Sequence, residues 1–108
     1  MDFKQIHDKA LDIREKYLQL EKKRGHEWSR SEIMMGFVGD VGDLAKLSMA
    51  KDGIRPLVNV DDKFAHELID CFWSILVLAD KYNVDLENEF VAKMDELEKN
   101  IDLELSNK

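Results

Sequence analysis

The sequence predicts an all-α fold, a four-helix antiparallel bundle in a single domain that spans residues 1–108. Three observations predict it. The chain contains one proline, apolar residues recur at spacings of three and four along four segments, and no segment alternates apolar and polar residues as a half-buried strand does. Because the connections between the four segments are short, neighbouring helices are expected to run antiparallel.

The first helix is expected from about Phe3 to Lys22. Asp2 and Gln5 have the spacing of a capping box at its start. Basic residues precede Gly25 at its end, which complements the helix dipole and permits a left-handed cap. Its apolar residues form one stripe: Phe3, Ile6, Ala10, Ile13, Tyr17 and Leu20.

The second and fourth helices also have readable boundaries. Ser29 and Glu32 have capping-box spacing, so a helix is expected to start there and to continue to about Lys51. The fourth helix is expected from about Asp85 to Ile101. The tail, residues 102–108, is expected to fray.

The third helix is expected to begin after a cap at Asn59 or Asp61 and to end near Tyr82. Only two of the residues from Leu68 to Ala79 are polar, so this helix is apolar around most of its circumference. Such a helix is buried on several sides. In a chain of 108 residues a second subunit most easily supplies that burial, so we expect a homo-oligomer.

Composition excludes several classes of function. The 16 basic and 23 acidic residues give a net charge of −7, which disfavours nucleic-acid binding. The strongest apolar run, Cys71 to Ala79, is much shorter than the roughly 20 residues that a membrane span needs. The N-terminus lacks the pattern of a signal peptide, and a lone cysteine fits a reducing compartment. A cytoplasmic protein is therefore expected.

Two acidic pairs stand in unusually apolar surroundings. Asp40 and Asp43 are embedded among apolar residues and glycines, and Glu67 and Asp70 open the most apolar stretch of the chain. Ionised carboxylates in such settings cost several kcal/mol each unless they are paired. A divalent cation offsets that cost, and all-oxygen ligands suit Mg²⁺ or Mn²⁺ shared with substrate phosphates. The alternative is that these carboxylates form caps or salt bridges, for example with Lys46, in an ordinary bundle.

Further residues near these pairs are candidates for substrate contact. Trp28 and Trp73 are aromatic rings that can stack on a base, and Arg30 lies at the positive end of the second helix, where phosphates bind. Core packing of the rings and a solvated arginine are the alternatives. Three glycines within the second helix, each costing about 1 kcal/mol relative to alanine, point to close approach of either a neighbouring helix or a ligand: Gly36, Gly39 and Gly42.

The segments Phe37–Lys46 and Glu67–Trp73 resemble the MazG-like branch of the all-α nucleoside triphosphate pyrophosphohydrolases. Members carry G-E-x-x-E on one helix and E-x-x-D on the next. The variant typical of dCTP pyrophosphatase-like members is most similar, here as Gly39-Asp-Val-Gly-Asp-Leu44. The likeness extends from about Trp28 to Met94.

This resemblance implies a four-helix subunit in a homodimer or homotetramer and hydrolysis of a nucleoside triphosphate to the monophosphate and pyrophosphate, as nucleotide-pool housekeeping. Asp40 and Glu67 would be catalytic, with Asp40 the general base. Lys93, on the fourth helix, matches a lysine that reaches substrate phosphate. The implied ligands of Mg²⁺, or of Mn²⁺ in its place, are Asp40, Asp43, Glu67 and Asp70.

The sequence also departs from the family pattern. Both glutamates of the second helix are aspartates here, each shorter by one methylene, and Leu97 stands where an asparagine is expected. These departures favour an alternative, a non-catalytic module of the same fold that binds nucleotide and metal. A helical interaction protein with structural carboxylates is a further alternative.

Overall fold

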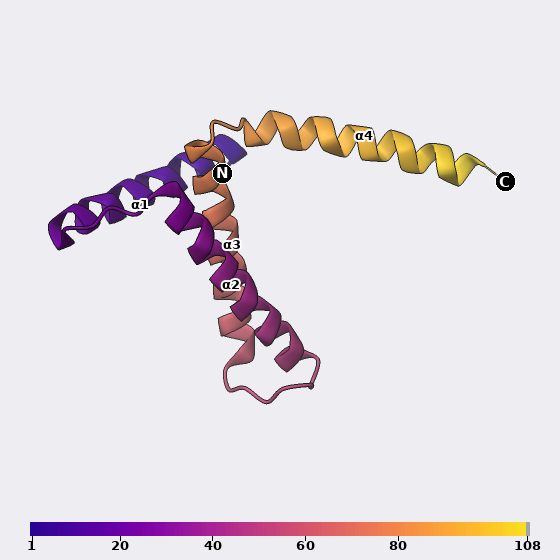
Figure 1. Cartoon of the computed structure of the whole chain (residues 1–108). Helices are drawn as coiled ribbons and strands as arrows, with labels where there is room; N and C mark the ends of the chain where they lie inside the picture. The colour runs from indigo at the N-terminus through magenta and orange to yellow at the C-terminus, as the bar shows by residue number, and fades with distance from the viewer. Residues whose placement is uncertain (108) are drawn as a thin grey trace.

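The computed structural model describes residues 1–107 and contains four α-helices: α1 (Phe3–Arg24), α2 (Arg30–Lys51), α3 (Val60–Lys81) and α4 (Leu86–Ser106). No strand occurs within these residues, so the all-α class and the four helices are confirmed. Helices α2 and α3 lie side by side and antiparallel, α1 crosses the end of this pair, and α4 extends away from the rest (Figure 1).

The local signals at the helix ends are confirmed. Asp2 and Gln5 form a capping box at the start of α1, and Gly25 ends that helix in the left-handed conformation at φ 84°. Ser29 and Glu32 form the same box on α2. Asn59 is the N-cap of α3, in the left-handed region at φ 53° and without a side-chain capping bond.

The end of α4 differs from the prediction. We expected fraying after Ile101, but the helix continues to Ser106 and is capped by Asn107. The prediction that the tail frays is therefore wrong for residues 102–106. Lys108 lies outside the described residues. The last turn is closed by the backbone N–H of Asn107, which donates to the carbonyls of Leu103 and Glu104.

The core centres on the C-terminal half of α3. Leu76, Val77, Leu78 and Ala79 are consecutive and all buried, so this part of the helix is covered on every side as predicted. Cys71 is buried one turn earlier, and burial raises the pKa of its thiol. A buried thiol with a raised pKa is a packing residue of low reactivity.

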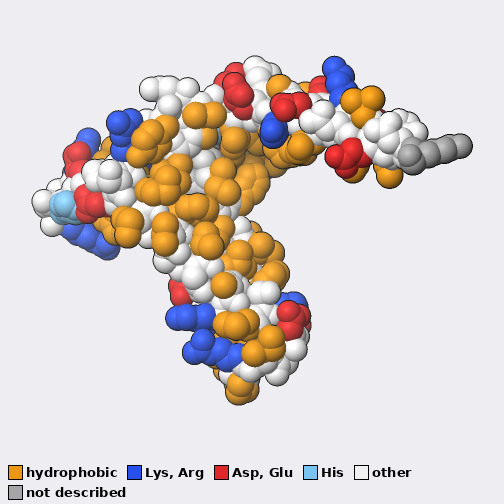
Figure 2. Space-filling model, turned by 45° about the vertical axis from the view of Figure 1, so that its right-hand side comes forward, with side chains coloured by type: hydrophobic (Ala, Val, Ile, Leu, Met, Phe, Trp, Pro, Cys, Tyr) orange, Lys and Arg blue, Asp and Glu red, His pale blue; other side chains and the backbone are white. Residues whose placement is uncertain are grey.

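The middle of α3 carries several apolar residues that are open to solvent. Leu68, Ile69, Phe72 and Ile75 are between 42% and 63% exposed. Figure 2 shows apolar side chains over much of the visible face of the helical body and along α4. The predicted burial of α3 on several sides therefore does not extend to these residues within one chain.

Helix α4 does not close the predicted antiparallel bundle within one chain. The radius of gyration is 17.8 Å, against about 13 Å for a compact domain of this length. At the α3–α4 junction Asn83 adopts φ 58° and the backbone N–H of Val84 donates to the Ala79 carbonyl over 2.8 Å, so α3 ends in a left-handed turn before α4 begins. Among residues 1–107 no helix combines the length and apolar character that crossing a membrane requires.

Candidate metal and nucleotide site

Three of the four predicted metal ligands come together between α2 and α3. Asp40 and Asp43 lie about one turn apart on α2, and Glu67 faces them from α3; one carboxylate oxygen of each lies within 4.8 Å of the others. We call these residues the carboxylate cluster. Helices α2 and α3 pair in antiparallel fashion, and this pairing places the acidic motif of α2 beside the acidic motif of α3.

The charges of the carboxylate cluster are not neutralised. Burial raises the pKa of Asp40, and the carboxylates of Asp70 and Asp43 raise it further. Burial likewise raises the pKa of Glu67, with repulsion from Asp40, Asp70 and Asp43 adding to it and His66 opposing it. None of the ion pairs found among the described residues involves these three carboxylates.

A second observation concerns one oxygen of Glu67. Its Oε2 atom is buried and has no hydrogen-bond partner. A buried carboxylate oxygen without a partner is costly, and a hard divalent cation held by all-oxygen ligands is one arrangement that offsets such a cost. The donor set and the unpartnered oxygen therefore fit Mg²⁺ or Mn²⁺.

Asp70, the fourth predicted ligand, lies beside the cluster rather than in it. Its carboxylate is close enough to raise the pKa of both Asp40 and Glu67, yet it is exposed and outside the set of mutually close oxygens. Asp70 and Asp40 both border an open cavity between the helices. It is thus placed to contact a bound ligand or water on the edge of the cluster.

An open cavity of about 530 Å³ adjoins the cluster where α1, α2 and α3 meet. Its walls combine aromatic rings, arginines and the two carboxylates at its border. Cavities of several hundred Å³ with apolar walls and a few polar groups are typical of small-molecule sites. We call it the three-helix cavity; its main lining residues are Arg14, Tyr17, Glu21, Arg24, Trp28, Phe37, Asp40, Asp70 and Trp73.

Two of the predicted substrate-binding residues line this cavity. Trp28 lies against Gly36, where an added Cβ would approach its ring to 3.3 Å, so the absent side chain gives the ring room. Trp73 donates its indole N–H to the Ala10 carbonyl over 3.0 Å and packs against Tyr17 with ring centroids 5.6 Å apart. Both rings keep an accessible face on the cavity, Trp28 with 48% of its surface exposed.

The other two predicted substrate-binding residues do not line the cavity. Arg30 lies over the ring of Tyr82, 4.4 Å from its centroid. Lys93 is on the projecting α4, where its ammonium lies 3.7 Å from the carboxylate of Glu96. Within one chain neither residue is placed beside the carboxylate cluster.

A partly buried ion pair in the cavity wall was not predicted from the sequence. Nη1 of Arg14 lies 2.5 Å from Oε2 of Glu21 and Nη2 lies 3.1 Å from Oε1, and both side chains are almost fully enclosed. Glu21 also accepts the backbone N–H of Trp28 over 2.8 Å. The hydrogen bonds from Arg14 are the main cause that lowers the pKa of Glu21, despite its burial. The pair therefore anchors the loop that carries Trp28.

A sequence signal for this wall was present. Arg14, Tyr17, Glu21 and Arg24 are spaced by three, four and three, which places them on one face of α1. The charges that surround Arg14 in the sequence, on Asp12, Glu15 and Lys16, are by themselves typical of a solvated face. Arg14, Glu21 and Arg24 share a helix face with Tyr17, however, and Tyr17 belongs to the apolar stripe. This shared face indicates that the row of polar residues is partly enclosed.

Gly39 and Gly42 border the cluster and face open space. A Cβ at either position would meet no atom within 4 Å outside the local helix backbone. Close packing of a neighbouring helix within this chain therefore does not explain them, whereas Gly36 is explained by Trp28.

We expect Gly39→Ala and Gly42→Ala each to stabilise the isolated, ligand-free chain by about 0.5–1 kcal/mol, because alanine restricts the unfolded chain and favours helix. Urea denaturation followed by circular dichroism measures this. Gly36→Ala is the matched control and should gain less, since Trp28 must shift. Destabilisation by Gly39→Ala would contradict the prediction and show that something approaches the backbone there.

The sequence matches no protein-family model and no curated protein, and no solved structure matches the fold.

Proposed function

We propose that this chain is a Mg²⁺-dependent nucleotide pyrophosphohydrolase that converts a nucleoside triphosphate to the monophosphate and pyrophosphate. One observation supports this most: the carboxylate cluster, in which the pKa values of Asp40 and Glu67 are raised, opens onto an aromatic cavity large enough for a base and sugar. The MazG-like resemblance of Phe37–Lys46 and Glu67–Trp73 implies the same reaction. We also propose that the chain acts as a homo-oligomer in the cytoplasm, serving the nucleotide pool.

The role proposed for each residue follows from its position in the site. Asp40, Asp43 and Glu67 would hold the metal ion, and Asp70 lies beside them. Bound Mg²⁺ supplies charge neutralisation at phosphate oxygens and orientation of water, the chemistry that phosphoryl transfer needs most. Trp28 and Trp73 line the same cavity as Asp40 and Asp70, so their aromatic faces are available to stack on a nucleotide base.

Asp40 is the candidate general base. A carboxylate that borders the substrate cavity can accept a proton from the attacking water. Asp40 also belongs to both the cluster and the cavity wall, so it lies between the proposed metal and the proposed substrate.

The experiment is pyrophosphate release from a panel of ribo- and deoxynucleoside triphosphates, with Mg²⁺ and with a chelator. We expect metal-dependent release that Glu67→Gln lowers at least about 100-fold, while the control Glu15→Gln, on the exposed side of α1, leaves it unchanged. Saturable nucleotide binding without release would favour the non-catalytic binding module. Absence of both, with Glu67→Gln indistinguishable from wild type, would favour the helical interaction protein.

Two observations favour the binding module. Lys93 lies outside the cavity of its own chain and Leu97 replaces the family's asparagine. A site without these phosphate contacts would bind a nucleotide through its rings and metal alone. Isothermal titration of a non-hydrolysable triphosphate in Mg²⁺ separates weak binding of this kind from no binding.

A further inference from the structure

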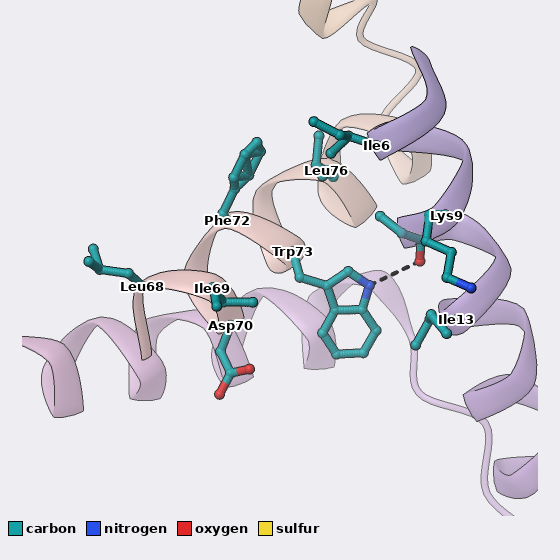
Figure 3. Close-up of a pocket in the computed structure, with 10 residues that line it drawn as sticks. Ile6, Lys9, Ile13, Leu68, Ile69, Asp70, Phe72, Trp73 and Leu76 are labelled. Atoms are coloured by element: carbon teal, nitrogen blue, oxygen red, sulfur yellow. Dashed lines mark hydrogen bonds between the residues drawn. The ribbon is translucent and has the colours of Figure 1, made fainter. Parts of the chain in front are cut away.

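A second apolar surface lies on the opposite side of Trp73. It is a groove of about 520 Å³ between α1 and α3 (Figure 3), lined on α1 by Ile6, Lys9, Ala10 and Ile13 and on α3 by residues from Leu68 to Leu76. Leu68, Ile69 and Phe72 stand exposed in it. We call this surface the α1–α3 groove.

Helix α4 carries the complementary feature. Its apolar residues recur at spacings of four and three and form one stripe, exposed in the single chain: Phe90, Met94, Leu97, Ile101 and Leu105, each between 41% and 76% exposed. We call it the α4 stripe. An amphipathic helix of this kind is stable when its apolar face lies in an apolar groove.

The surface area of the chain indicates how much remains to be covered. The chain exposes 8456 Å², against about 6,200 Å² for a folded monomer of 12.6 kDa. The excess of about 2,200 Å² per chain is what a subunit contributes to an obligate homodimer interface, which buries about 2,000–5,000 Å² in total.

Charges along the borders of the two surfaces match. Asp95, Glu98 and Asp102 are spaced by three and four along one border of the α4 stripe. Lys9 lines the groove, and Lys16 lies two turns further on the same side of α1. Helix α4 carries seven acidic and two basic residues, whereas α1 carries seven basic and four acidic ones.

We propose that the α1–α3 groove receives the α4 stripe of a second copy of this chain, so that two subunits exchange their fourth helices. A second copy is favoured over the chain's own α4 because α4 projects away from its own groove after the left-handed turn at Asn83. A two-fold exchange places both grooves and both stripes in one isologous interface. This inference does not depend on the proposed hydrolase activity.

The test is sedimentation velocity of the full chain over a concentration series. We expect a dimer whose dissociation constant rises about 100-fold in Leu97→Glu, because the substitution places a charge in the centre of a buried interface. Ala92→Glu adds the same charge on the opposite face of α4 and should change the constant less than about 3-fold. A chain that stays monomeric, or a dimer equally tolerant of both variants, overturns the proposal.

Charge reversal tests the pairing of the two surfaces without touching an apolar residue. Lys9→Glu with Lys16→Glu, and separately Glu98→Lys with Asp102→Lys, should each weaken the dimer, and the combined variant should recover most of the loss. Recovery in the dimer supports the exchange. Additive loss in the combined variant overturns it.

Discussion

The double variant Asp40→Asn/Glu67→Gln is expected to be more stable than the wild type when metal is absent, and to gain nothing from Mg²⁺. Both carboxylates have raised pKa values because they are buried near other negative charges. Neutral amides of the same shape remove this repulsion, for a gain of about 1–2 kcal/mol in the free energy of unfolding. Mg²⁺ should raise the melting temperature of the wild type alone.

The pH dependence has a definite sign. A carboxyl group with a raised pKa binds more protons in the folded than in the unfolded state, so its contribution to stability falls as pH rises. For Asp40 and Glu67 the fall begins at the ordinary carboxyl pKa and ends at the raised value. The difference between wild type and double variant in chelator should therefore widen across this interval.

Thermal and urea denaturation at a series of pH values, with chelator or Mg²⁺, measures both effects. Glu15→Gln is the matched control, since it removes one exposed carboxylate from α1 and should follow the wild type throughout. A double variant less stable than the wild type in chelator would mean that the carboxylates are structural, as in an ordinary bundle.

Breaking the Arg14–Glu21 pair is expected to be the largest single loss of stability outside the apolar core. Glu21→Gln or Arg14→Met leaves one enclosed charge without a partner, at a cost of about 3 kcal/mol, the low end for buried pairs because this one borders an open cavity. The lowered pKa of Glu21 adds stability above its unfolded pKa, and that contribution is lost as pH falls through the folded value.

A double-mutant cycle checks this prediction by urea denaturation. The combined variant Arg14→Met/Glu21→Gln should be less destabilised than the sum of the two single variants, because no unpaired charge remains and the glutamine can still accept the Trp28 N–H. Asp8→Asn, in the exposed pair Lys4–Asp8 of the same helix, should cost less than about 0.5 kcal/mol. Additivity in the cycle would show that the two charges are independently solvated.

Features that depend on a few neighbouring residues were predictable from the sequence. The capping boxes at Asp2 and Ser29 and the left-handed cap at Gly25 require only local spacing, and all three are present. The meeting of Asp40, Asp43 and Glu67 was also predictable, because two i, i+3 acidic pairs on consecutive antiparallel helices can share one level.

Features set by tertiary contacts were not predictable in the same way. The direction of α4 depends on the conformation of Asn83 rather than on the pattern of the helix itself. The enclosure of Arg14 depends on where α1 crosses the α2–α3 pair, which no periodicity in α1 reveals. Asp70 has the spacing of a ligand, yet one turn of α3 beyond Glu67 carries it to the edge of the cluster.

Trp73 and Asp70 form part of both the three-helix cavity and the α1–α3 groove. A wall shared by two sites transmits any displacement from one to the other, and binding at the two sites is then thermodynamically linked and reciprocal. A helix seated in the groove would fix the indole that faces the cavity, so nucleotide affinity would vary with protein concentration. Saturating nucleotide would, by the same coupling free energy, strengthen the association of subunits.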